Sequence, residues 1–234
     1  MGRLINFKPL SPLTSSPLRI LYNKTVKRAI IFYNGDLADL TQAKKYIHPG
    51  DFIICADGGV RHAFTLGLQP NIVIGDFDSS SENLQQQITD QSIKTIKYKT
   101  DKDETDSELA INYAIEQGYE TIIVFGLLGT RLDHLLTNIF YLANKNADIM
   151  IIEGKQEIRV TQKALVINGS VGDLVSLLPL LGDVKNVSTE GLQYKLTGAD
   201  LRFGYSFGLS DVMTEESAKI SFEKGTLLVI HERI

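Results

Sequence analysis

The chain has 234 residues, of which 43% are hydrophobic and 22% are charged, and its formal net charge is −4. This composition is ordinary for a globular protein of one large domain or two small ones. The slightly acidic balance argues against nucleic acid or an anionic membrane as a bulk partner, and no apolar run reaches the roughly 18 residues of a membrane span.

The first 30 residues contain six Lys or Arg and no acid. A transit peptide is conceivable, but three prolines and little helical amphipathicity favour a peripheral or poorly ordered extension over residues 1–27. The single cysteine, Cys55, excludes an intramolecular disulfide and a cysteine-based metal site. Its place in an apolar run predicts inert packing, and it is consistent with a reducing, cytoplasmic location.

Strands and helices alternate in the first two thirds of the sequence. The apolar runs predict strands over residues 29–33, 52–55, 71–76, 93–98 and 121–126. Helical periodicity predicts helices over residues 37–47, 60–68, 81–88, 105–118 and 132–146. Thr105 and Glu108 fit a capping box, Gly118 fits a helix C-terminus, and the last helix has a stripe of Leu132, Leu135, Leu136, Ile139 and Ala143. The alternation predicts a mostly parallel α/β sheet.

Short strands and turns dominate after Ala147. Strands are predicted over residues 148–153, 157–167, 173–180, 219–222 and 226–230, with a hairpin at Lys224 and Gly225. The fold class is therefore α/β: an N-terminal, mostly parallel α/β domain at 28–150, followed by a C-terminal antiparallel β-sandwich or barrel at 151–234.

Aspartates follow several of the predicted strands. Asp57 follows the second strand, Asp76 and Asp78 follow the third, and Asp101 and Asp103 follow the fourth. In a parallel α/β sheet ligands bind at the carboxyl ends of the strands, and if the chain stays extended after the third strand, its two aspartates point the same way. Clustered carboxylates raise one another's pKa values unless a cation offsets them. Because Mg²⁺ takes carboxylates together with phosphate oxygens, the pattern predicts a site for Mg²⁺ and phosphate.

Basic residues and glycines accompany the aspartates. Arg131 and Lys102 can meet phosphate charge, and glycines let the backbone approach a phosphate closely. These glycines are Gly58, Gly59, Gly126 and Gly129. The combination predicts metal-assisted transfer of a phosphoryl-type group.

Each part also has a structural explanation. Asp106 can favour the dipole at a helix N-terminus, and residues 76–79 can form a turn with side-chain caps. Gly58 and Gly59 can mark only a turn, and a histidine near a helix start, such as His134, is more often structural than catalytic. The functional interpretation therefore rests on the assembly of these residues and not on any one of them.

The order of the motifs resembles the thiamine pyrophosphokinase family. The motifs are ADGG at 56–59, GDFDS at 75–79, DKDETD at 101–106, GLLGTRLDH at 126–134, SLLPL at 176–180, GLQYKL at 191–196, and LRFG followed by GLS at 208–210. The resemblance spans about residues 28–232. It implies an ATP- and Mg²⁺-dependent enzyme that transfers the pyrophosphoryl group of ATP to the hydroxyl of thiamine, giving thiamine diphosphate and AMP. It also implies a homodimer, with thiamine between the α/β domain of one subunit and the β domain of the other.

The resemblance implies roles for individual residues. Asp76 and Asp78 would hold Mg²⁺ with one aspartate of the DKDETD motif, where Asp103 is favoured and Asp101 and Asp106 remain open. Catalytic roles fall on Asp57, Asp106, Arg131 and Asp133, with Asp133 a candidate proton acceptor. ATP-binding roles fall on Gly58, Gly59, Lys102, Thr105, Gly129, Arg131 and His134. Thiamine-binding roles fall on Tyr194, Ser210 and Asp211.

Two positions depart from the family pattern. Thr130 stands where glycine is usual, and Asp211 stands where asparagine is usual, so the phosphate geometry and the contacts to the thiamine pyrimidine are open. Two other functions use the same residues: a Mg²⁺-dependent phosphohydrolase, or a non-catalytic nucleotide or thiamine sensor. The thiamine-binding motifs argue against the hydrolase, and retention of the metal carboxylates argues against the sensor.

Overall fold

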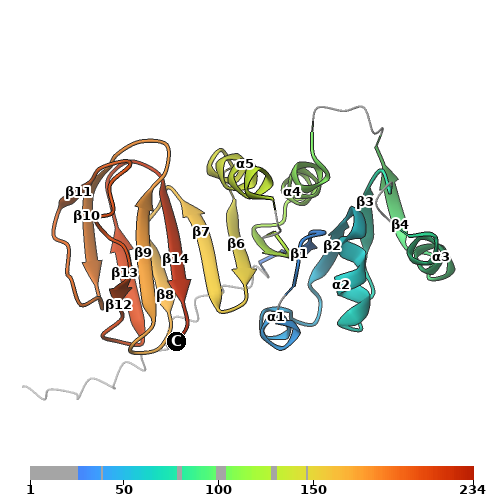
Figure 1. Cartoon of the computed structure of the whole chain (residues 1–234), viewed down its shortest axis with the longest axis horizontal. Helices are drawn as coiled ribbons and strands as arrows, with labels where there is room; N and C mark the ends of the chain where they lie inside the picture. Colours follow the sequence, from blue (N-terminus) through green and yellow to red (C-terminus); the bar gives the residue numbers. More distant parts are fainter. Residues whose placement is uncertain (1–25, 38, 78–80, 99–103, 128–130, 146) are drawn as a thin grey trace, which may run out of the picture.

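The computed structural model of the chain describes residues 26–37, 39–77, 81–98, 104–127, 131–145 and 147–234. Strands alternate with helices as far as the sixth strand, and residues 147–234 contain strands and turns (Figure 1). In the described ranges, no helix has the length and apolar character needed to cross a membrane.

The first six strands form the parallel part of a large sheet. They are β1 (Arg28–Phe32), β2 (Phe52–Ala56), β3 (Ile72–Gly75), β4 (Lys94–Lys97), β5 (Thr121–Phe125) and β6 (Asp148–Glu153). Their order in the sheet is β6-β5-β1-β2-β3-β4, and every neighbouring pair is parallel. Because β1 lies between β5 and β2, the carboxyl ends of these three strands meet at the centre of one edge.

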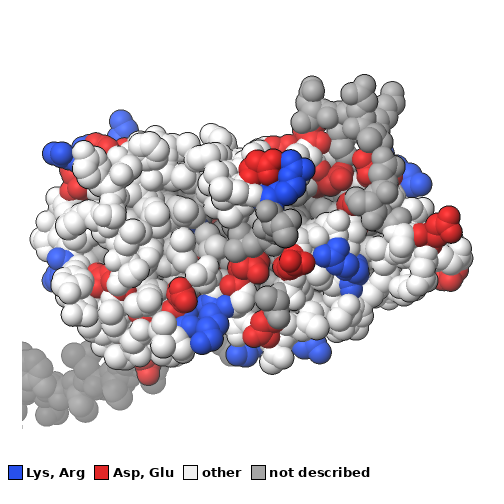
Figure 2. Space-filling view, viewed as in Figure 1, with Lys and Arg blue, Asp and Glu red and all other residues white. Residues whose placement is uncertain are grey.

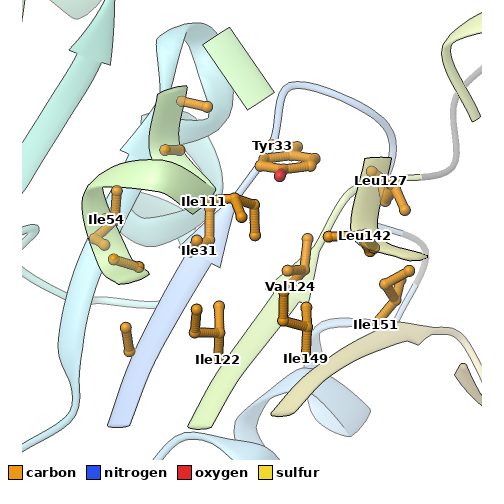
Figure 3. Close-up of a cluster of buried hydrophobic side chains, with 14 of the residues drawn as sticks. Ile31, Tyr33, Ile54, Ile111, Ile122, Val124, Leu127, Leu142, Ile149 and Ile151 are labelled. Carbon is orange, nitrogen blue, oxygen red and sulfur yellow. The ribbon is translucent and has the colours of Figure 1, made fainter. Parts of the chain in front are cut away.

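Helices cover both faces of this parallel part. They are α1 (Leu40–Tyr46), α2 (Val60–Thr65), α3 (Glu82–Asp90), α4 (Asp106–Glu116) and α5 (Leu132–Ala143). Side chains of β1, β2, β5 and β6 pack beneath α4 and α5 (Figure 3), and α1, α2 and α3 cover the opposite face. Burial on both faces explains why the central strands are nearly continuous apolar runs. Cys55 is fully buried on β2, which confirms its role in packing.

The remaining strands are antiparallel and form a sandwich. They are β7 (Gln156–Thr161), β8 (Leu165–Asn168), β9 (Leu174–Pro179), β10 (Val184–Glu190), β11 (Ala199–Leu201), β12 (Asp211–Val212), β13 (Ser217–Ser221) and β14 (Leu227–Glu232). Four of them continue the parallel part into one ten-stranded sheet, in the order β12-β9-β14-β7 next to β6. The other four form a second sheet, β11-β10-β13-β8, and the two sheets enclose a separate apolar core. The predicted fold class is confirmed.

One local prediction is wrong, that of a hairpin at Lys224 and Gly225. β13 and β14 lie in different sheets, so Lys224 and Gly225 do not form a hairpin. Gly225 has φ of 123°, and a Cβ there would lie 2.8 Å from Asp183 O, so glycine allows the chain to cross closely between the sheets. The stripe on α5 is only partly buried, because Leu132 and Leu136 are 65% and 43% exposed.

The division of the chain into domains stays a prediction. β6 pairs parallel with β5 and antiparallel with β7, so this one strand joins the parallel part to the sandwich. The predicted boundary between 28–150 and 151–234 falls within β6. Residues 1–25 of the predicted extension at 1–27 lie outside the described residues.

Candidate active site

A cleft of about 540 Å³ lies at the carboxyl ends of β1, β2 and β5. Its lining includes five predicted site residues: Asp57, Thr105, Asp106, Arg131 and His134. A larger hollow of about 610 Å³ lies at the opposite edge, beside the first residues of β5 and β6, and contains none of them. Acidic and basic side chains intermix over the α/β half of the molecule, whereas the middle of the sandwich half is largely uncharged on the face in view (Figure 2). The smaller cleft is therefore the candidate active site, because it contains the predicted residues and lies at the carboxyl ends of the parallel strands, although its volume is smaller.

The end of β2 presents Asp57 in an unusual backbone conformation. Asp57 is 5% exposed, and its φ of 45° lies in the left-handed region that residues with a side chain seldom adopt. It begins a 3₁₀ turn (Asp57–Gly59) that leads directly into α2. A mostly buried carboxylate on a strained backbone at a strand end is typical of a functional site.

The end of β3 lies against the same aspartate. A Cβ on Gly75 would lie 3.1 Å from Asp57 Cβ, so the strand ends are close and Asp76 follows at once. Phe77 has φ of 66°, so the chain is not extended after Asp76. The expectation that Asp76 and Asp78 point the same way required an extended chain, so it no longer follows. Asp78 itself lies outside the described residues.

The start of α4 brings two more predicted residues into the cleft. Thr105 and Glu108 form the predicted capping box: Glu108 N donates to Thr105 Oγ1, and Thr105 N donates to Glu108 Oε2. Asp106 is the first helical residue, where its charge favours the helix dipole. Tyr33 Oη, which is buried at the end of β1, donates to Ser107 O at 2.9 Å. This bond fixes the start of α4 beside β1.

The start of α5 contributes an exposed ion pair. Arg131 Nη2 lies 2.5 Å from Asp133 Oδ2, Arg131 Nε lies 3.2 Å from Asp133 Oδ1, and both side chains are more than 60% exposed. The hydrogen bond from Arg131 lowers the pKa of Asp133 to about 2. Arg131 and His134 line the cleft, whereas Asp133 does not. In this arrangement Asp133 is a weak base.

Several predicted residues lie outside the described part of the chain: Asp78, Lys102, Asp103 and Gly129, together with Asp101 and Thr130. Among the described residues, no three His, Cys, Asp or Glu side chains gather into a metal site. Of the predicted metal ligands, Asp76 and the alternative Asp106 are described, and Asp57 lies at the same edge. Their carboxylate oxygens are hard ligands of the kind that Mg²⁺ prefers. The donor chemistry at the edge therefore fits the predicted Mg²⁺.

The glycines near the cleft have a packing role. A Cβ on Gly58 would lie 2.4 Å from Asn34 Oδ1, one on Gly59 would lie 2.2 Å from Phe32 O, and one on Gly126 would lie 2.8 Å from Tyr33 O. Neither Gly58 nor Gly59 lines the cleft. Glycine is required at these positions because the backbone packs closely against β1 and the loop after it. The pattern in the sequence instead predicted a close approach to a phosphate.

The predicted thiamine-binding residues form a second group at the far end of the large sheet. Asp211, 8% exposed, accepts hydrogen bonds from Tyr194 N and Val212 N, and Ser210 has φ of 53°. Tyr194 is 69% exposed. The structure brings these residues together, but none of them lines the cleft. Large apolar side chains on the loop between β11 and β12, which we call the aromatic loop, are also exposed: Phe203, Tyr205, Phe207 and Leu209.

Sequence reasoning missed part of the cleft wall. The loop after β1, residues 33–36 (the β1 loop), lines the cleft with Tyr33, Asn34, Gly35 and Asp36. Asn34, Gly35 and Asp36 by themselves are only a turn signal. Its place directly after a central parallel strand was the available signal, because ligands bind beyond such strand ends.

Family models match both halves of the chain. "Thiamin pyrophosphokinase, catalytic domain" matches residues 43–152, and "Thiamin pyrophosphokinase, vitamin B1 binding domain" matches residues 155–227. A thiamine pyrophosphokinase from Bacillus subtilis is 28% identical over 182 residues, which cover 76% of this chain and 85% of the relative. Thiamine pyrophosphokinase 1 from Oryza sativa is 23% identical over 207 residues, with 77% and 78% covered.

Solved structures agree with the fold. The crystal structure of the Bacillus subtilis thiamine pyrophosphokinase has a TM-score of 0.81 and 25% identity, and the match covers 89% of this chain and all of the other. A thiamin pyrophosphokinase from Candida albicans has a TM-score of 0.71 and 17% identity, with 89% of each chain covered, which supports the fold alone. With both domain models matched in order along most of its length, the chain belongs to the thiamine pyrophosphokinase family.

Proposed function

We propose that this protein transfers the pyrophosphoryl group of ATP to the hydroxyl of thiamine, forming thiamine diphosphate and AMP. The observation that carries the proposal is the cleft in which buried Asp57, the start of α4 and Arg131 meet at the carboxyl edge of the parallel sheet. A carboxylate and an arginine at such an edge suit a polyphosphate with its metal. The proposed location is cytoplasmic, which rests on the single reduced cysteine.

The described residues have distinct tasks in this proposal. Arg131 reaches the cleft with an exposed guanidinium and would bind phosphate oxygens in a bidentate manner. Asp76, with Asp78 and Asp103, would hold Mg²⁺ beside Asp57, and the metal would supply charge neutralisation on the phosphates when bound. Asp133 would orient the thiamine hydroxyl and accept its proton. Positioning and electrostatics account for most of the rate in such transfers.

We propose that a second chain completes the thiamine site. In the large sheet six strands separate β12 from β2, and Figure 1 shows β11 and β12 at the end of the molecule remote from β2 and β3. Seven interstrand steps of about 4.8 Å place Asp211 and Asp57 roughly 34 Å apart along the sheet. One thiamine molecule is too short to touch both groups in one chain. We infer a homodimer in which Tyr194, Ser210 and Asp211 of one subunit face the cleft of the other.

The aromatic loop would contribute to the same interface. Phe203, Tyr205 and Phe207 of this loop are each more than half exposed, as is Tyr194 outside it. Several exposed aromatic side chains close together are characteristic of surfaces that bind a ligand or another protein. An aromatic platform beside the carboxylate of Asp211 suits the cationic, aromatic thiamine molecule.

The test is product analysis with ATP and Mg²⁺, with and without thiamine. We expect AMP and thiamine diphosphate to form in equal amounts, and only when thiamine and metal are both present. Thiamine-independent phosphate release would identify a phosphohydrolase. Binding of thiamine or ATP without product would identify a sensor.

A further inference from the structure

We propose that Arg61 and His62 on α2 are positioning residues that fix the β1 loop as a rigid wall of the nucleotide cleft. The inference rests on the proposed function and assigns a role to two residues that lie outside the sequence motifs. Neither side chain lines the cleft itself. Both act through the loop, which does line it.

Arg61 makes three hydrogen bonds to the loop. Its Nη2 donates to Asn34 O at 2.9 Å and to Gly35 O at 3.0 Å, and its Nη1 donates to Asn34 Oδ1. One planar guanidinium thus satisfies two main-chain carbonyls and one amide oxygen. A lysine ammonium lacks this fork geometry and cannot replace it fully.

His62 makes a second side-chain contact to the same loop. It is 8% exposed, and its Nε2 lies 2.8 Å from Gly35 O. Since a carbonyl only accepts, Nε2 carries the proton and donates. Burial lowers the pKa of His62, which favours the neutral ring that makes this single bond.

The remaining sides of the loop are closed by the sheet. Gly35 N donates to Gly126 O at the end of β5, at 2.9 Å. The space beside Asn34 is closed as well, because a Cβ on Gly58 would lie 2.4 Å from Asn34 Oδ1. The loop is therefore held by α2, β5 and the turn after β2, and it has little room to move away from the cleft.

A loop that is fixed in advance lowers the entropy cost of binding ATP. A loop that is already in its bound conformation loses less entropy when a ligand arrives. Asn34 also lies between the cleft and a second hollow of about 290 Å³ between α2 and α3, so displacement of the loop would merge the two spaces. The larger effect of loosening the loop should fall on ATP, because the cleft would hold its phosphates, whereas the ring of thiamine in our proposal is held by the far end of the partner subunit.

The experiment compares Arg61→Ala, Arg61→Lys, His62→Leu and His62→Gln in the full-length protein. We expect Arg61→Ala and His62→Leu to raise KM for ATP about fivefold or more, with KM for thiamine and kcat changed less than twofold. Arg61→Lys should be intermediate, and His62→Gln should be near wild type, because a glutamine amide can donate from nearly the same place. Lys44→Ala, at an exposed cation on α1, is the charge-matched control and should change nothing.

Two further measurements separate the possible failures. Calorimetric binding of ATP with Mg²⁺ and no thiamine should weaken in parallel with KM, and melting temperatures identify variants that simply lose stability. A lower melting temperature with unchanged KM and unchanged ATP binding would overturn the positioning role while leaving the proposed function intact. A wild-type protein that neither binds ATP nor forms AMP would overturn both.

Discussion

The pair of Arg131 and Asp133 defines the chemistry available at the start of α5. Held by Arg131, Asp133 has a pKa of about 2 and is a weak proton acceptor at neutral pH. Arg131 also lines the cleft, so phosphate oxygens would compete with Asp133 for the guanidinium. Binding of ATP should therefore release the carboxylate and raise its basicity at the moment when a proton acceptor is needed.

Asp133→Asn removes this acceptor and keeps the shape of the side chain. We expect kcat to fall by about 100-fold or more, since a positioned general base contributes roughly that factor. The melting temperature should stay within about 1 °C, because the pair is exposed and contributes little to stability. Steady-state kinetics with saturating ATP and thiamine provide the measurement.

Asp148→Asn is the matched control. Asp148 pairs with Arg159 at 3.1 Å, is also more than half exposed, and lies at the opposite edge of the sheet. Its substitution should leave kcat unchanged. Near-normal turnover in Asp133→Asn would remove Asp133 from the proton transfer and limit it to holding Arg131.

For single residues, the sequence predicts which side chains belong to the candidate site better than it predicts their backbone conformation and contacts. Asp57 and Arg131 were identifiable because charged groups after buried strands are costly without a partner. The left-handed backbone at Phe77 was not identifiable, because a bulky residue is rare in that conformation and only the surrounding structure imposes it. The role of Arg61 depends on carbonyls 26 and 27 residues away, and no local pattern encodes such a contact.

The capping box at the start of α4 links an element to the cleft. Thr105 satisfies the backbone N–H of Glu108 and also lines the cleft beside Asp106. Thr105→Ala should lower the free energy of unfolding by about 1 kcal/mol, the usual cost of a lost N-cap. Thr105→Ser keeps the accepting hydroxyl and should recover most of the loss. Urea unfolding followed by circular dichroism gives both values.

Thr89→Ala on α3 separates capping from the general effect of losing a threonine. The hydroxyl of Thr89 donates to Gln85 O within the helix, so it does not cap a backbone N–H at the helix N-terminus. Its removal should change stability by less than about 0.5 kcal/mol. If Thr105→Ala were equally mild, the cap would not determine the position of α4, and any loss of activity would have to come from direct contact with the nucleotide.

Elements were predicted well where the signal is local. The capping box, the parallel strands and the five helices follow from periodicity and cap chemistry, and their observed ends differ by a few residues. The hairpin prediction failed because Lys224 and Gly225 give the same local signal whether the flanking strands pair or enter different sheets. Which strands pair in the sandwich is a long-range property of the packed cores.

At the scale of the whole molecule, a buried polar cluster joins the helical layer to the sandwich. Tyr46 Oη on α1 donates to Glu157 Oε1 on β7 at 2.6 Å, and Arg233 Nη2 donates to the same oxygen at 2.5 Å. His231 on β14 lies between Glu157 Oε2, at 3.9 Å, and Asp173 Oδ2, at 2.9 Å. These bonds connect α1 to β7 and to the C-terminal strand, and they should make stability depend on pH.

The direction of that dependence follows from the two pKa shifts. Burial alone would raise the pKa of Glu157, but interactions with His231, Tyr46 and Arg233 lower it from 4.5 to about 2. Its stabilisation is therefore complete above pH 4.5 and is lost as pH falls toward 2. Burial alone would lower the pKa of His231, but interactions with Glu157 and Asp173 raise it above 6.5. That contribution is complete below pH 6.5 and is lost as pH rises through the raised value.

Glu157→Gln tests the cluster, with unfolding free energies measured from about pH 3 to pH 8. The wild type should be most stable in the pH range between the titrations of Glu157 and His231. In that range the free energy of unfolding of the variant should be lower by on the order of 2 kcal/mol. The variant should also show a flatter acid limb, because the carboxylate that titrates is gone. Glu190→Gln, at a carboxylate that pairs with Lys219 and is 66% exposed, is the control and should follow the wild-type curve. Parallel curves for wild type and Glu157→Gln below pH 4.5 would assign the acid sensitivity to other carboxylates, and the contact between α1 and β7 would then contribute no charge-dependent stability.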